Sequence, residues 1–74
     1  MITIDGRAYT KVAVTELVGR YSVYLMPASN IEQEECVLTD ASREKALLAT
    51  IILKSIVEDE TKQVEISTLY NTII

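Results

Sequence analysis

Apolar and polar residues alternate through the first third of the chain, and this pattern predicts antiparallel strands within residues 2–26. A period of two is typical of a strand with one buried face. The dipeptides Asp5-Gly6 and Val18-Gly19 interrupt the alternation. Both are typical of tight hairpin turns, because glycine accepts the positive φ angle that such turns require. The pattern therefore predicts three strands joined by two hairpins.

The second turn sets the register of the two strands that it joins. A two-residue turn at Val18-Gly19 pairs Leu17 with Arg20, Val14 with Val23, and Val12 with Leu25. The expected core face then carries Val12, Val14, Val23 and Leu25, and the opposite face carries Tyr24 and Met26. The first hairpin allows two registers: a two-residue loop sets Ile2 and Ile4 with Tyr9, whereas a bulged loop sets Ile2 with Ala8.

A helical pattern follows and runs to about Val57. Thr39 or Asp40 is expected to cap this helix, because a side-chain oxygen there accepts a hydrogen bond from an amide of the first turn. At about 100° per residue, one broad face carries the apolar residues expected in the core: Ala41, Ala46, Leu48, Ala49, Ile52, Leu53, Ile56 and Val57. Leu47 and Ile51 fall instead on the opposite, charged face.

Two segments fit more than one structure. Pro27 ends the third strand, because proline cannot donate a ladder hydrogen bond. After it, residues 35–39 fit a short strand and residues 30–35 fit a helical turn, and the pattern leaves both open. Residues 64–74 fit either a strand or a helix, and we favour a strand followed by a short tail.

These elements predict an α+β fold: a small antiparallel sheet of three to five strands, in the order β-β-β-α-β, with one long helix packed on one face. A chain of 74 residues has room for one domain, expected to span residues 1–74. Its only aromatic residues are four tyrosines, so the core is expected to be aliphatic.

The residue types that are absent exclude several kinds of chemistry. The chain has no histidine, and Cys36 is its only cysteine. Ser-His-Asp or Cys-His catalysis and a tetrahedral zinc site therefore cannot form within one chain. A carboxylate pair remains, but a sugar-binding cleft usually also needs aromatic platforms, and the chain has no tryptophan. We expect no enzyme activity, no cofactor and no metal, and we interpret Cys36 as a residue that fills the core.

The same cysteine count and the hydropathy profile bear on location. A single cysteine cannot form an internal disulfide, which favours a reducing compartment. The longest uncharged apolar stretch runs from Ala46 to Leu53, far short of the roughly twenty residues that span a bilayer. We expect a soluble, cytoplasmic protein, which for a phage-encoded chain means the host cytoplasm.

The formal net charge of −4 is concentrated in two acidic clusters. One cluster holds Glu32, Glu34 and Glu35, and the other holds Glu58, Asp59 and Glu60. They favour a protein partner with a basic surface and disfavour direct binding to nucleic acid. The second cluster lies where the helix should end, where negative charge opposes the helix dipole. It fits either an acidic docking patch or a solvated turn that aids solubility.

Leu47 and Ile51 are the candidate apolar contact residues. An i, i+4 apolar pair among charged residues fits a surface that contacts a partner or a second copy, as in a homodimer. It also fits a pair that residues 27–39 or the C-terminal tail cover.

One resemblance to a known family accompanies these patterns. The run from Gly19 to Tyr24, then Pro27, and then the helix start from Thr39 to Ala46 resembles HicB-type antitoxins, in which a helix packs on a small sheet. In size, acidity and plan the chain is also similar to small phage-encoded inhibitors such as anti-CRISPR proteins and DNA mimics.

The patterns and the resemblance together define three expected roles. The first is a non-enzymatic acidic protein that binds and inhibits a bacterial nucleic-acid-handling protein. The alternatives are an antitoxin that neutralises a small toxin and a self-assembling structural subunit, for example of a phage.

Overall fold

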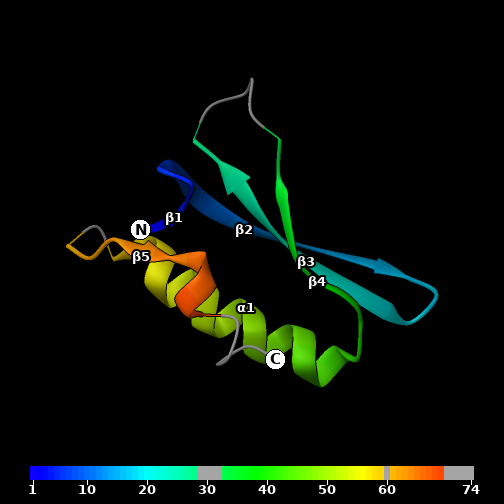
Figure 1. The fold of residues 1–74 in the computed structure, drawn as a ribbon. Helices are drawn as coiled ribbons and strands as arrows, with labels where there is room; N and C mark the ends of the chain where they lie inside the picture. The colour runs from blue at the N-terminus through cyan, green and yellow to red at the C-terminus, as the bar shows by residue number, and fades with distance from the viewer. Residues whose placement is uncertain (29–32, 60, 70–74) are drawn as a thin grey trace.

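A computed structural model of the chain describes residues 1–28, 33–59 and 61–69. In these residues five strands form one sheet, and a helix packs across one of its faces (Figure 1). The elements are β1 (Ile2–Ile4), β2 (Arg7–Leu17), β3 (Arg20–Pro27), β4 (Glu35–Ala41), α1 (Arg43–Glu58), β5 (Val64–Glu65) and a 3-10 turn at Ile66–Thr68. The spatial order of the strands is β4-β3-β2-β1-β5. The α+β class and the helix packed on a sheet are therefore confirmed.

The chain has one more strand before the helix than the sequence predicted. Residues 35–39, for which the sequence left a short strand open, form β4 at one edge of the sheet together with Asp40 and Ala41. The helical turn considered for residues 30–35 lies largely outside the described residues. The sheet is also not wholly antiparallel. β5 pairs parallel to β1 at its other edge, and the Thr3 hydroxyl donates to the Glu65 carboxylate at 3.1 Å. A parallel pair needs a long connection between its strands, and here that connection includes α1.

Both hairpin turns form where the sequence placed them. Leu17 pairs with Arg20 and Val14 with Val23, as predicted, and the first hairpin takes the register that sets Ile2 opposite Tyr9. Each turn has two consecutive residues at positive φ: Asp5 and Gly6 at 51° and 81°, and Val18 and Gly19 at 52° and 75°. This pair of positive angles is typical of type I′ turns, whose twist matches that of the flanking strands.

Val18 occupies a backbone conformation that suits it poorly. A β-branched side chain at positive φ is disfavoured by roughly 1–2 kcal/mol, whereas asparagine tolerates this region. We therefore expect Val18→Asn to raise the free energy of unfolding by about 1 kcal/mol, measured by urea denaturation. Gly19→Ala at the next position should lower it, because the alanine would have to adopt a φ of 75°. A Val18→Asn variant that is less stable than the parent would contradict this account.

The core lies between α1 and the sheet. Its buried apolar residues are Ile2, Tyr9, Val23, Leu25, Val37, Ala46, Ala49, Leu53, Val57, Ile66 and Leu69. The expectation of an aliphatic core is wrong in one respect, since Tyr9 is almost fully buried. Its place follows from the first hairpin, which sets Tyr9 opposite the equally buried Ile2.

The helix starts later than predicted, and the side of it that is buried is narrower than predicted. Ser42 is the N-cap, and its hydroxyl accepts a hydrogen bond from the Lys45 amide at 3.3 Å, because Thr39 and Asp40 belong to β4. Only Ala46, Ala49, Leu53 and Val57 are buried on α1, whereas Leu48 is exposed. The apolar arc of the helix is wider than the stripe that a small sheet covers, so periodicity alone did not define the buried side. Within the described residues, no helix is long and apolar enough to cross a membrane.

Candidate interaction surfaces

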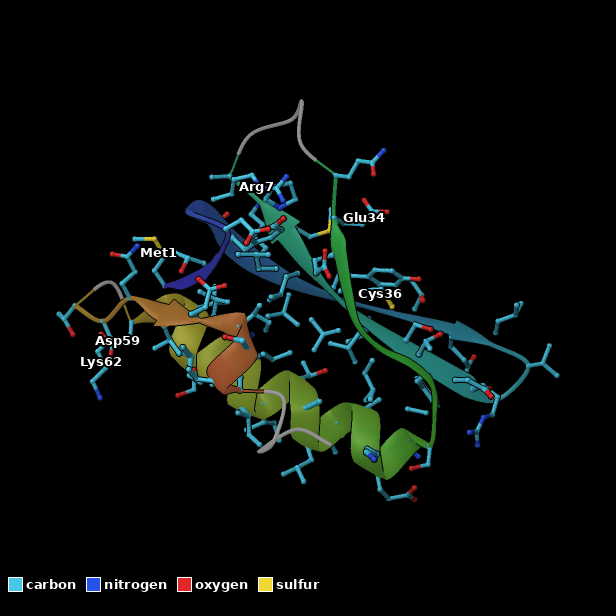
Figure 2. All side chains as sticks on the ribbon, in the orientation of Figure 1. Met1, Arg7, Glu34, Cys36, Asp59 and Lys62 are labelled. Atoms are coloured by element: carbon cyan, nitrogen blue, oxygen red, sulfur yellow. The ribbon has the colours of Figure 1, made fainter. Side chains whose placement is uncertain are left out.

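The two acidic clusters lie on different parts of the molecule. Glu34 comes just before β4 and Glu35 is its first residue, whereas Glu58 ends α1 and Asp59 is its C-cap. Figure 2 shows Glu34 and Asp59 well apart. Glu32 and Glu60, the other members of the clusters, lie outside the described residues. The structure therefore does not bring Glu34 and Asp59 together into one acidic patch.

Asp59 has a local structural role. Its Oδ1 atom accepts hydrogen bonds from the amide and the hydroxyl of Thr61, at 3.0 and 2.5 Å. The bonds from the Thr61 hydroxyl and then from its amide hold the pKa of the Asp59 carboxyl below its ordinary value. This carboxylate therefore holds the turn that follows α1, and among the described acids at this end of the helix Glu58 is the exposed one.

The N-terminal ammonium group lies in the same turn. It donates to the carbonyl oxygens of Ile56, Asp59 and Lys62 at 2.7, 2.6 and 2.9 Å. The Met1 carbonyl in turn accepts a hydrogen bond from the Val64 amide at 2.9 Å. Figure 2 shows Met1, Asp59 and Lys62 gathered at this end of the molecule. The last turn of α1 has no basic side chain, so the ammonium group supplies the positive charge that a helix C-terminus favours.

Three of the carboxylates predicted to bind a partner remain available to one. Among the described residues, Glu34, Glu35 and Glu58 take part in no ion pair. The ion pair that the described residues do contain joins Arg20 to Asp40 at 2.9 Å, and the Arg20 guanidinium also donates to the Asp40 carbonyl. This contact ties the end of β4 to the β2–β3 hairpin. Glu34 and Glu35 lie at the other end of β4, an edge strand that a second protein can approach.

The apolar candidates on α1 are exposed. Leu47 and Ile51 are each 58% exposed, so residues 33–39 do not cover them, and the tail beyond residue 69 lies outside the described residues. Across from Leu47, an open groove of about 200 Å³ separates α1 from the β2–β3 hairpin. It is lined by Val14, Tyr21, Arg43, Ala46, Leu47 and Thr50. The groove is mainly apolar, and Arg43 gives it one positive charge.

Tyr21 and Glu16 form a polar contact on the strands beside this groove. They are directly paired residues of β2 and β3. A hydrogen bond to the Glu16 carboxylate, with smaller effects of partial burial and of the Glu16 charge, raises the pKa of the Tyr21 hydroxyl, and the Arg43 charge opposes this shift.

The tip of the β2–β3 hairpin is an apolar feature that sequence reasoning missed. Leu17 is 78% exposed and Val18 is 91% exposed. The residue type at position 18 could have revealed this feature in the sequence, since a turn of this kind usually has asparagine, aspartate or glycine where Val18 stands.

Cys36 does not fill the core as predicted. It is exposed, and its thiol donates to the Leu38 carbonyl at 3.5 Å. Cys36 pairs with Tyr24, and the next residue, Val37, is buried instead, because successive side chains of a strand point to opposite faces of the sheet. In the part of the chain that the structure describes, no cluster of three or more cysteine or acidic side chains is arranged to hold a metal ion.

Together these features define a small α+β domain with an apolar groove beside Leu47, an apolar hairpin tip and separate exposed acids. Comparison of the chain with known protein families, with curated proteins and with solved structures finds no significant match. The functional conclusion therefore depends on the surfaces of this chain alone.

Proposed function

We propose that this chain is a non-enzymatic protein-binding module that inhibits a bacterial nucleic-acid-handling protein. The observation that carries the proposal is the set of carboxylates at Glu34, Glu35 and Glu58, which have no cationic partner among the described residues. The formal net charge of −4 favours approach to a basic surface and opposes approach to nucleic acid itself.

The mechanism is competition for positive charge. A protein that handles nucleic acid holds phosphate groups with lysine and arginine side chains. Carboxylates that occupy those side chains form charge-assisted hydrogen bonds and leave the phosphates without their ligands. Because exposed charges are screened by salt, binding of this kind weakens as ionic strength rises.

The position of Glu34 and Glu35 suits this contact. Both lie at the start of an edge strand, and Glu34 is exposed. Glu58 lies at the end of α1 and serves as a separate contact, since Asp59 beside it is held by Thr61. In the antitoxin alternative the same acids bind a small basic toxin.

Charge reversal at one acid tests the proposal. We expect Glu34→Lys to reduce retention of a basic nucleic-acid-binding protein from bacterial lysate by about tenfold at low salt, the loss of one charge-assisted contact. Glu44→Lys, which makes the same charge change on the first turn of α1, is the matched control and should retain the partner. Retained proteins are identified by mass spectrometry.

Each other outcome of this experiment has a defined meaning. Equal retention by Glu34→Lys and the parent chain would contradict a contact at the start of β4. Equal loss with Glu44→Lys would show that overall charge, and no particular surface, governs retention. A small toxin retained through a high-salt wash would replace the inhibitor by the antitoxin.

A further inference from the structure

Most of β2 has a free edge on the side away from β3. β1 pairs with Arg7, Ala8 and Tyr9, at the start of β2. Among the described residues, no strand pairs with residues 10–17 on that side. Figure 1 shows β2 continuing past β1 toward the hairpin tip. A long strand edge of this kind presents unpaired backbone groups to another chain.

The outward backbone groups of this edge belong to alternate residues. In a two-residue hairpin the residues beside the turn, here Leu17 and Arg20, exchange backbone hydrogen bonds, and bonded pairs then alternate along the ladder. The pairing of β2 with β3 has no register shift between the bulge after Tyr9 and the turn. The residues that direct their N–H and C=O groups away from β3, into the free edge, are therefore Val12, Val14 and Glu16.

Apolar side chains lie exposed beside the same edge. Val14 is 45% exposed, although Val23, its partner on β3, is completely buried. Val14 and Leu47 line one groove, and Ile51, one helical turn after Leu47, is exposed to the same extent as Leu47. These side chains belong to both layers of the domain, the sheet and the helix. An extended peptide would cover the strand alone, so an occupant that covers them all brings a helix as well as a strand.

We propose that a second copy of this chain pairs along this edge, with the β2 strands of the two copies antiparallel about a twofold axis at Val14. The two sheets then form one continuous sheet, and the two α1 helices lie side by side on one of its faces. This inference goes beyond the inhibitor function and does not depend on it.

The free edge itself selects this register. The available stretch runs from Lys11, after the bulge, to Leu17, before the turn, and Val14 is its midpoint. A twofold axis there sets Val14 opposite Val14 of the other copy, and Val12 opposite Glu16. The three residues with outward backbone groups therefore face one another and can make the hydrogen bonds of an antiparallel ladder. The start of β2 stays paired with β1.

The spacing of strands and helices fits this arrangement. Adjacent strands lie about 4.8 Å apart, so the twofold axis passes about half that distance outside β2. α1 packs mainly on β2 and β3, so its own axis lies on the inner side of β2. A similar distance inside β2 sets the two helices about 10 Å apart, close to the separation of packed helices. Leu47 and Ile51 of both copies then lie beside the gap between the helices and become buried there.

The charges across this pairing are complementary. Glu16 of one copy lies opposite Val12 of the other, and Val12 lines a cavity together with Lys54. Neither Glu16 nor Lys54 takes part in an ion pair among the described residues, so the two can pair between copies. Glu58 also lines this cavity, one helical turn farther from the axis than Lys54.

The twofold axis does not bring like charges together. The two Glu16 residues are four strand positions apart, or roughly 13 Å at 3.3 Å per residue. This distance exceeds the screening length of about 8 Å at physiological ionic strength. The residue at the axis, Val14, is uncharged, so an apolar contact forms the centre of the interface.

Sedimentation equilibrium of the 74-residue chain tests the proposal. We expect the mass to rise from 8.3 kDa toward twice that value as the concentration increases to about 1 mM. Val14→Lys, which sets two ammonium groups against each other at the axis, should raise the dissociation constant at least about tenfold. Thr15→Lys is the matched control, because Thr15 is exposed on the opposite face of the same strand and lies across from Ala13 of the other copy.

An exchange of two charges separates loss of pairing from loss of folding. Glu16→Lys, which repels Lys54 of the other copy, should weaken the dimer, and the double variant Glu16→Lys, Lys54→Glu should restore it. Circular dichroism measures whether each variant is folded. A single 8.3 kDa species at every concentration would overturn the proposal. A dimer unaffected by Val14→Lys, one that Thr15→Lys dissociates equally, or one that the double variant fails to restore would also overturn it.

Discussion

Replacing Leu53 by alanine should lower the free energy of unfolding by about 3 kcal/mol. Leu53 is completely buried near the middle of α1, which packs mainly on β2 and β3. Truncation removes apolar contacts and leaves a cavity that a well-packed core cannot fully close. A domain of this length has a total stability of roughly 4–11 kcal/mol, so the change removes a large part of it. Urea denaturation followed by circular dichroism measures the loss.

Leu48→Ala is the control for this experiment. The periodicity of the sequence places Leu48 and Leu53 on the same apolar face, whereas in the structure Leu48 is more than half exposed. We expect its truncation to change stability by less than about 0.5 kcal/mol. Equal losses for the two variants would mean that α1 is rotated relative to the sheet from the orientation described here.

Acetylation of the Met1 α-amino group in the 74-residue chain should cost about 2–3 kcal/mol of stability. The ammonium group satisfies three carbonyl oxygens, those of Ile56, Asp59 and Lys62. An acetylated nitrogen carries no charge and has a single N–H to donate, so at least two charge-assisted bonds are lost. Each hydrogen bond to a charged group contributes about 1.5–3 kcal/mol, and partial exposure of this site reduces the sum.

Chemical synthesis provides the matched pair for this measurement, because it yields the same chain with a free or an acetylated amino group and unmodified lysines. The acetylated chain should unfold at a lower urea concentration, with a similar dependence on denaturant. Identical unfolding curves would show that the ammonium group does not stabilise the end of α1.

The elements that the sequence predicted well are those specified by local chemistry. Asp5-Gly6 and Val18-Gly19 supply the positive φ angles of two-residue turns, and those turns set the register of both hairpins. The helix was predictable because its apolar periodicity is long. These features depend on neighbours in the chain, so a single sequence contains the information needed to recognise them.

The elements that were missed depend on contacts between distant residues. In β4, register shifts and a positive φ of 51° at Asp40 disturb the period of two on which strand recognition relies. Which of Cys36 and Val37 is buried depends on the pairing of β4 with β3, and that pairing exposes Cys36 and buries Val37. The buried side of α1 is defined by the sheet beneath it, which no periodicity specifies when the apolar arc is wide.

The candidate surfaces were predictable to a similar extent. That Leu47 and Ile51 lie off the buried side of α1 followed from their place among charged residues on the helix, but the sequence left open whether another segment covers them. The groove could not be predicted from the sequence, because Val14 and Leu47 are 33 residues apart and meet only when α1 packs beside the hairpin. The role of Asp59 was also hidden, since Thr61 and the N-terminal ammonium group define it.

Binding to a basic protein surface is the central claim, and its most direct test is the salt dependence of partner retention. The immobilised chain is incubated with bacterial lysate and washed with sodium chloride from about 0.05 to 1 M, a range over which the screening length falls severalfold. We predict that a basic nucleic-acid-binding protein is retained at the low concentration and released before the high one. Retention through the highest salt, or capture of no such protein at the lowest, would contradict the claim.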